Sequence, residues 1–158
     1  MTELSDKEAQ VLLEALNDEY KAYSTYDQII KDFGSVRPFT NIREAEGRHI
    51  AALLGLFERY HLPVPDNPWP GRVDRYTSLD EACREGVEAE IANGEMYARL
   101  IQNTRQADIL TVLGNLQAAS QQRHLPAFRR CTERSAESSQ QLRGRRCGGR
   151  GRKHQSDG

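Results

Sequence analysis

The chain has no long hydrophobic run. None of its apolar stretches approaches the roughly 18 residues that a membrane-spanning helix needs, and only 37% of its 158 residues are hydrophobic. The first residues, Met1 to Asp6, form neither a basic segment nor an apolar one, so we expect no signal peptide. A cytoplasmic protein with one domain, long enough to bury a core, is the expectation that follows.

Cysteine is scarce. The three cysteines, Cys83, Cys131 and Cys147, form no Cys-x-x-Cys pair. This spacing argues against a structural zinc site, a cysteine-ligated iron centre and a disulfide framework. We therefore predict that two of the three are small apolar packing residues and that the third is a thiol in the C-terminal tail.

Neither sign of charge is in large excess, because 22 basic residues almost balance 23 acidic ones. The balance is uneven, since six of the basic residues but only two of the acidic ones lie from Ser135 to the end. Hydrophobic periodicity stops at the same point, which predicts a bundle over residues 1–134 and a disordered basic tail over 135–158. Six charges without aromatic residues favour a solvated tail over a nucleic-acid site.

The remaining chain is dominated by helical periodicity. Ser5 and Glu8 form a capping-box pattern that opens a helix, and Gly34 is placed to close it. Apolar residues recur along this helix every three or four positions, with a single acid, Glu19, among them. This stripe consists of Leu12, Leu16, Glu19, Tyr23, Tyr26, Ile30 and Phe33.

A second helix is predicted from Phe39 to about Tyr60, after a connection short enough to make it an antiparallel neighbour of the first. Its apolar stripe contains Glu46 and His49, which lie one turn apart on the same face. An acid and an imidazole that face a core are costly to bury unless something pairs with them.

Four prolines within residues 61–71 exclude a helix there and predict a long crossover, with Trp69 over one end of the core. Ser78 and Glu81 form a second capping-box pattern, which opens a third helix that carries Glu90 and ends near Asn103. A fourth helix, capped by Asp108, runs from Ile109 to about Arg134. It carries His124, and Pro126 should open one of its turns. The pattern predicts an all-α fold, an antiparallel four-helix bundle with a Pro-rich crossover between helices 2 and 3.

The two halves of the chain repeat one another. Arg48-His49 matches Arg123-His124 at an offset of 75, and Glu19 with Tyr26 matches Glu90 with Tyr97 at an offset of 71. Four polar groups buried independently would each cost several kcal/mol. A shared metal centre removes that cost, because iron and manganese favour carboxylate and imidazole ligands. In such bundles one Glu from each of two helices can bridge the ions, while Glu-x-x-His from the others caps the ends. The predicted ligands are Glu19, Glu46, His49, Glu90 and His124.

The second half departs from the repeat at Gln121, where the second Glu-x-x-His would have its acid. An amide can bind through its oxygen but supplies no charge, so a second metal should bind more weakly. Three outcomes stay open: a metal pair with Gln121 or water as a ligand, a single metal, or a relict site. Acids that could compensate in another register are Glu88, Glu95 and Glu133.

Tyrosines and arginines near the predicted ligands have two interpretations. Tyr23, Tyr26 and Tyr97 could bond the ligands or carry an electron, although core tyrosines with satisfied hydroxyls are more common. Arg48 and Arg123 are expected to form surface ion pairs.

The order Glu19, Glu46-x-x-His49, Glu90, His124 resembles the ferritin-like, or rubrerythrin-like, di-iron superfamily. More narrowly, residues 37–42, the crossover to Trp69 and residues 120–128 resemble the uncharacterised family called domain of unknown function 2202. The resemblance covers about residues 4–134. It implies one or two iron ions, with manganese or zinc as alternatives, redox chemistry with O2 or peroxide, and a homodimer. The alternative is a non-catalytic scaffold or interaction protein with a degenerate metal site.

Overall fold

The fold is described from a computed structural model, which covers residues 3–147, with side chains described up to Ser138. It consists of helices, and residues 3–147 contain no β-strand, so the predicted all-α class is confirmed. None of these helices is long and apolar enough to cross a membrane. The helical segments are α1 (Asp6–Phe33), α2 (Phe39–Arg59), α3 (Leu79–Ile101), α4 (Ala107–Ala119), the π-helix η1 (Ser120–His124) and α5 (Leu125–Cys147).

The first helix begins and ends where its sequence predicts. The Ser5 side chain accepts a hydrogen bond from the backbone N–H of Glu8, and the Glu8 side chain accepts one from the backbone N–H of Ser5. Gly34 closes the helix with a φ of 92°, a conformation that glycine adopts without the steric cost of a Cβ. At α3 only half of the predicted capping box forms. The Ser78 side chain accepts a hydrogen bond from the backbone N–H of Glu81, but the Glu81 side chain accepts one from the backbone N–H of Thr77 instead of that of Ser78.

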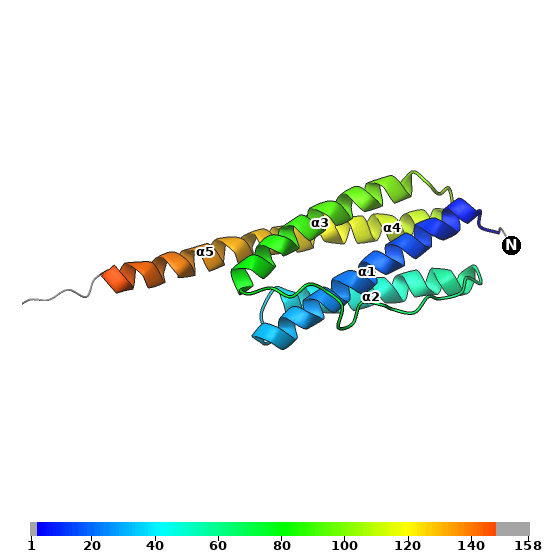
Figure 1. Ribbon diagram of the computed structural model, residues 1–158. Helices are drawn as coiled ribbons and strands as arrows, with labels where there is room; N and C mark the ends of the chain where they lie inside the picture. The colour runs from blue at the N-terminus through cyan, green and yellow to red at the C-terminus, as the bar shows by residue number, and fades with distance from the viewer. Residues whose placement is uncertain (1–2, 148–158) are drawn as a thin grey trace, which may run out of the picture.

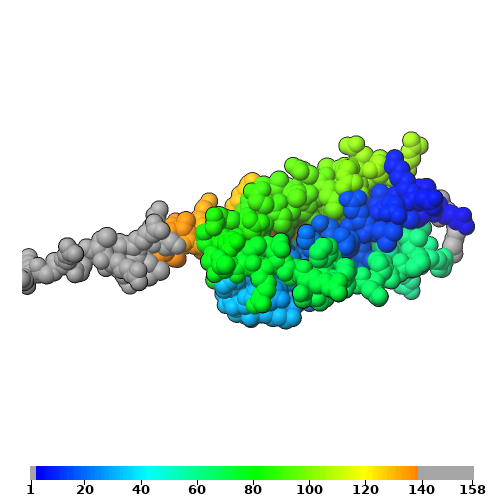
Figure 2. All heavy atoms as spheres, in the orientation of Figure 1, coloured from blue at the N-terminus to red at the C-terminus, as the bar shows by residue number. Residues whose placement is uncertain are grey.

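The helices form two pairs, which Figure 1 shows as adjacent layers. α1 packs on α2, and α3 packs on the continuous helix formed by α4, η1 and α5. The non-helical segment 60–78 joins the two pairs and lies against α1 (Figure 2). There the Trp69 indole donates to the Asn17 side chain at 3.0 Å, and Lys21 lies over its ring. Trp69 therefore covers the side of α1, not an end of the core as predicted.

The apolar core has two parts. One part is centred on Leu16 of α1 and Phe57 of α2, and the other on Phe39 of α2 and Phe128 of α5. Along every helix the buried acids and histidine fall between residues of the first part and residues of the second. The polar centre is thus enclosed by hydrophobic side chains at both ends.

Pro126 has the local effect that its position predicts. Proline has no backbone N–H to donate to the carbonyl four residues earlier, and the helix accommodates this with a π-helical turn immediately before it. The N–H of Leu125 donates to the carbonyl of Ser120, five residues back, so the chain stays helical from α4 into α5. The N-terminus of α4 differs from the prediction. Its N-cap is Gln106, and Asp108 accepts hydrogen bonds from the Tyr60 hydroxyl at 2.7 and 2.8 Å.

The predicted end of the fourth helix at about Arg134 is wrong, because α5 continues to Cys147 (Figure 1). Residues 135–143 contain alanine, glutamate, glutamine, leucine and arginine, which favour helix, and no proline or glycine. Loss of an apolar stripe therefore signals the end of packing here, not the end of the helix. Residues 148–158 of the predicted tail lie outside the described residues.

The interpretation of Cys83 and Cys131 as unbonded packing residues is also wrong. Both side chains are buried, but they form a disulfide that links α3 to α5. The two residues are 48 positions apart, with no sequence pattern to pair them, and only the packing of α3 on α5 brings their Cα atoms within 5.7 Å.

Reduction of this disulfide should destabilise the protein markedly. Opening a loop with a sequence separation of 48 costs about 4 kcal/mol in the chain-entropy model. Urea unfolding with and without reductant measures this, and the Cys83→Ser variant should not respond to reductant. An unchanged unfolding midpoint for the unmodified protein would contradict the assignment.

Candidate metal centre

Five side chains from four helical segments meet between the two parts of the core. Glu19, Glu46, Glu90 and His124 are each at most 4% exposed, and His49 is partly buried. Two groups of three have potential ligand atoms that all lie within 4.8 Å of one another. The first group is Glu19, Glu46 and His49, and the second is Glu46, Glu90 and His124. All five residues singled out from the sequence are therefore brought together.

Glu46 belongs to both groups. Its Oε2 lies 3.1 Å from Nδ1 of His49, and its Oε1 lies 3.3 Å from Nδ1 of His124. Glu19 and Glu90 each lie on one side only, at 3.5 Å from His49 and 3.4 Å from His124 respectively. Glu46 is thus the residue common to both groups, whereas the sequence prediction had given the bridging role to Glu19 and Glu90.

Two of the three candidate tyrosines bond the acids. The Tyr97 hydroxyl donates to Oε1 of Glu19, and the Tyr26 hydroxyl donates to Oε1 of Glu90 at 3.0 Å. Each tyrosine lies in the opposite half of the repeat from the acid that it bonds, so the two halves interlock here. Tyr23 has no hydrogen bond among residues 3–138 and packs near Gly47 instead.

The fourth helix contributes Ser120 where the sequence suggested Gln121. The Ser120 hydroxyl donates to Oε2 of Glu90 at 2.6 Å. The Gln121 amide instead donates to the backbone carbonyl of Glu90 at 2.8 Å and to Ser120 at 3.1 Å. A π-turn holds more residues than an α-turn, so the residue that faces the same way as His124 is four positions back, not three. Pro126 was the sequence signal for this shift.

The spare acids do not compensate. Glu88, Glu95 and Glu133 are exposed, and none belongs to either ligand group. The centre therefore has three carboxylates and two imidazoles, with a neutral serine at the position a fourth carboxylate would need.

Two buried ligand atoms have no hydrogen-bond partner within the described residues. These are Oε2 of Glu19 and Nδ1 of His124. Each lies in a different ligand group. Buried polar atoms are nearly always satisfied, and an unsatisfied one costs about 1–3 kcal/mol. Both atoms have ion-pair contacts within the centre, at 3.5 Å for Glu19 and at 3.3 and 3.4 Å for His124, and the donor set as a whole fits a divalent cation.

Without a metal, the ionisable groups strongly perturb one another. Burial and the nearby Glu46 raise the pKa of Glu19 well above its usual value. The pKa of Glu46 is lowered despite burial, because the polar groups of Glu19, His124 and His49 lie close to its carboxylate and stabilise the charged form. Burial lowers the pKa of His124, but the carboxylates of Glu46 and Glu90 outweigh it and raise that pKa to about 9. Perturbations of this kind are common at functional sites.

The metal-free protein should therefore lose stability as the pH rises from 6.5 to about 9. A histidine whose pKa is raised by folding stabilises the folded state fully below its unfolded pKa, and that contribution disappears as the pH approaches the folded pKa. The expected slope is at most about 1.4 kcal/mol per pH unit for one group. Urea unfolding of chelator-treated protein measures it, and His124→Gln should show a smaller slope. A free energy of unfolding that rises over this range would contradict the assignment.

Comparisons with known proteins support the fold and leave the function open. No protein-family model matches the chain, and no curated protein matches it. The resemblance to the ferritin-like superfamily and to domain of unknown function 2202 therefore stays a prediction. Among solved structures, the chain is similar to the crystal structure of hypothetical protein MJ0754 from Methanococcus jannaschii DSM 2661. The TM-score is 0.75 at 24% identity, over 86% of this chain and 85% of that chain, a likeness that shows a shared helical fold.

Proposed function

We propose that this protein is a ferritin-like metal-binding protein, an antiparallel four-helix bundle whose crossover is the Pro-rich segment 60–78. Its centre would hold one or two iron ions, with manganese or zinc as the alternatives, and would react with O2 or peroxide. This is chemistry of the ferroxidase, peroxidase or oxygenase kind. The resemblance to the ferritin-like superfamily also implies a homodimer, which light scattering during size-exclusion chromatography tests.

The observation that carries the proposal is the pair of ligand groups that share Glu46. Each group combines two carboxylates with one imidazole, the mixture of ligands that iron and manganese favour. A carboxylate with one oxygen toward each histidine is placed to contact two ions at once.

Charge favours one ion over two. Two divalent ions bring four positive charges, whereas Glu19, Glu46 and Glu90 supply three negative ones. Since Ser120 adds no charge, a full pair would leave one buried positive charge unless hydroxide or a substrate anion compensated it. We therefore infer that the first ion binds more tightly than the second.

The surrounding residues would hold the acids in place. Tyr97 donates to one oxygen of Glu19, and Tyr26 donates to one oxygen of Glu90. Ser120 donates to the other oxygen of Glu90. Such supporting hydrogen bonds restrict the orientation of the ligands and tune their basicity. Bound iron would supply the electrons for reduction of O2 or peroxide.

The alternative is a scaffold whose polar core is only a hydrogen-bonded network. The hydrogen bonds from Tyr26, Tyr97 and Ser120 favour this alternative, because they satisfy several carboxylate oxygens without a metal. The network leaves Oε2 of Glu19 and Nδ1 of His124 with ion-pair contacts but no hydrogen bond, however, and a bound cation would take both atoms as ligands.

Metal analysis separates the two functions. Protein purified without chelator, and supplied with iron(II) under anaerobic conditions, should retain one to two ions per chain. The His49→Ala variant should lose metal, whereas the His61→Ala control, in the exposed connection after α2, should not. Fewer than about 0.2 ions per chain would count heavily against a working centre, because a centre that binds divalent ions should keep them through purification.

A further inference from the structure

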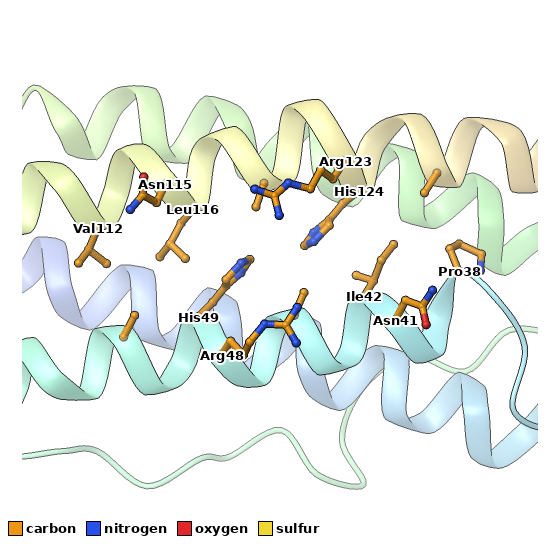
Figure 3. A pocket seen from close by; sticks show the side chains of 14 residues that line it. Pro38, Asn41, Ile42, Arg48, His49, Val112, Asn115, Leu116, Arg123 and His124 are labelled. Carbon is orange, nitrogen blue, oxygen red and sulfur yellow. The ribbon is translucent and has the colours of Figure 1, made fainter.

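A pocket opens beside the centre, between α2 on one side and α4 and η1 on the other (Figure 3). Its volume is about 530 Å³, within the range of pockets that bind small organic molecules. Both histidines of the centre line it, together with two arginines, two asparagines and a set of apolar side chains. The apolar lining residues include Ile42, Ala45, Val112, Leu116 and Ala119.

The arginines are Arg48 and Arg123, each immediately before a histidine of the centre. Their expected surface ion pairs are absent: neither side chain has an ion pair or hydrogen bond among residues 3–138. Figure 3 shows the two side chains on either side of the pocket, Arg48 from α2 and Arg123 from η1. Two cations without counter-ions therefore face one cavity from opposite walls.

The sign of the charge in this pocket is unusual for the molecule. None of its lining residues is acidic, although the chain as a whole has more acids than bases. A second pocket, between α1 and α3, is lined instead by acids, among them Asp18, Asp74 and Glu85. The pocket beside the histidines is thus selectively suited to an anion.

The histidines line the pocket with their rings. Their Nδ1 atoms lie toward the carboxylates, and their rings stack at 5.6 Å with an angle of 21° (Figure 3). The Nε2 atoms have no hydrogen-bond partner among residues 3–138. A histidine that binds metal usually donates its other N–H to an acceptor, and among the described residues no side chain takes that part.

We propose that this pocket binds a small organic anion, a carboxylate or a phosphate monoester carried on an apolar body. Arg48 and Arg123 hold the anionic group, because the planar guanidinium matches both anions with paired hydrogen bonds. The apolar walls contact the body, and the imidazoles face the anion from the floor. This goes beyond the proposed function, because the arginines and the cavity are present whether or not the centre holds metal.

Ligand-observed NMR titration of the full chain tests this with three matched probes: benzoate, phenyl phosphate and the neutral isostere benzamide. At least one anion should bind about tenfold more tightly than benzamide, as one charge-assisted contact implies. Arg48→Gln and Arg123→Gln should each weaken that binding about tenfold. Arg129→Gln is the matched control, an exposed arginine of α5 outside the pocket, and should bind as the unmodified protein does.

Two further measurements separate this proposal from the metal proposal. The metal content of Arg48→Gln and Arg123→Gln should equal that of the unmodified protein, and anion binding should persist after chelator treatment. Equal affinity for benzoate, phenyl phosphate and benzamide would overturn the anion site. So would anion binding that neither arginine variant weakens, or that disappears with the metal, since the anion would then be a ligand of the ion.

Discussion

Glu46→Gln should abolish metal binding at both positions of the centre. The Glu46 carboxylate is the single group common to the two ligand sets, with one oxygen toward each histidine. An amide of the same size removes the negative charge from both sets at once, and a buried divalent ion then has only one carboxylate on each side. We expect the metal content to fall at least about tenfold.

The neighbouring acids give the graded comparison. Glu19→Gln and Glu90→Gln each affect one ligand set, so each should retain close to half of the metal bound by the unmodified protein, or less if the ions bind cooperatively. Glu95→Gln, an exposed acid of α3, is the control and should retain all of it. Helix content measured by circular dichroism checks that each variant folds. Equal metal loss in Glu46→Gln and Glu95→Gln would contradict the shared position of Glu46.

Removal of metal should lower the thermal midpoint of unfolding by about 10 °C. A ligand that binds only the folded state at a thousand times its dissociation constant stabilises that state by about 4 kcal/mol. For a domain of this length each kcal/mol shifts the midpoint by about 2–4 °C. The effect is large because the metal-free centre brings three buried acids and two histidines together without a divalent ion among them.

Differential scanning calorimetry of metal-loaded and chelator-treated protein measures this shift. His61→Ala should show the full shift, because His61 is exposed and outside both ligand sets. Glu46→Gln should show little or none, since it has no metal to lose. Equal midpoints for loaded and chelator-treated protein, at equal pH, would favour the hydrogen-bonded scaffold.

Helical periodicity was sufficient to predict which polar side chains meet. Glu19, Glu46, Glu90 and His124 each occupy a position that the apolar stripe of its helix assigns to the core, and all four are buried. Packing of amphipathic helices then brings these side chains together in the core. The internal repeat separately indicated Glu19, Glu90 and the two histidines, but not Glu46, whose counterpart is Gln121.

The details that the sequence did not reveal depend on local geometry or on tertiary contacts. The role of Ser120 follows from the π-turn, which shifts the register of one helix face by a residue. The disulfide between Cys83 and Cys131 depends on the packing of α3 against α5, which no local pattern encodes. The membership of Glu46 in both ligand groups depends on where side chains that periodicity treats as equivalent lie in three dimensions.

The centre is asymmetric despite the internal repeat. Both ligand sets have two carboxylates and one histidine, but the acid of the second set, Glu90, is held by a tyrosine and a serine, whereas Glu19 is held by a tyrosine alone. His49 is also more exposed than His124, at 15% against 5% of the side chain. The two positions should therefore differ in affinity even though their ligands are of the same kinds.

Anomalous diffraction from crystals grown with iron(II) or manganese(II) tests the metal centre most directly. The expected map has a peak beside Glu46 in contact with Glu19 and His49 or with Glu90 and His124, and two peaks at high metal concentration, one on each side of Glu46. A map from fully supplemented crystals with no peak at Glu46, or with peaks only at surface residues, would contradict a metal centre in this bundle.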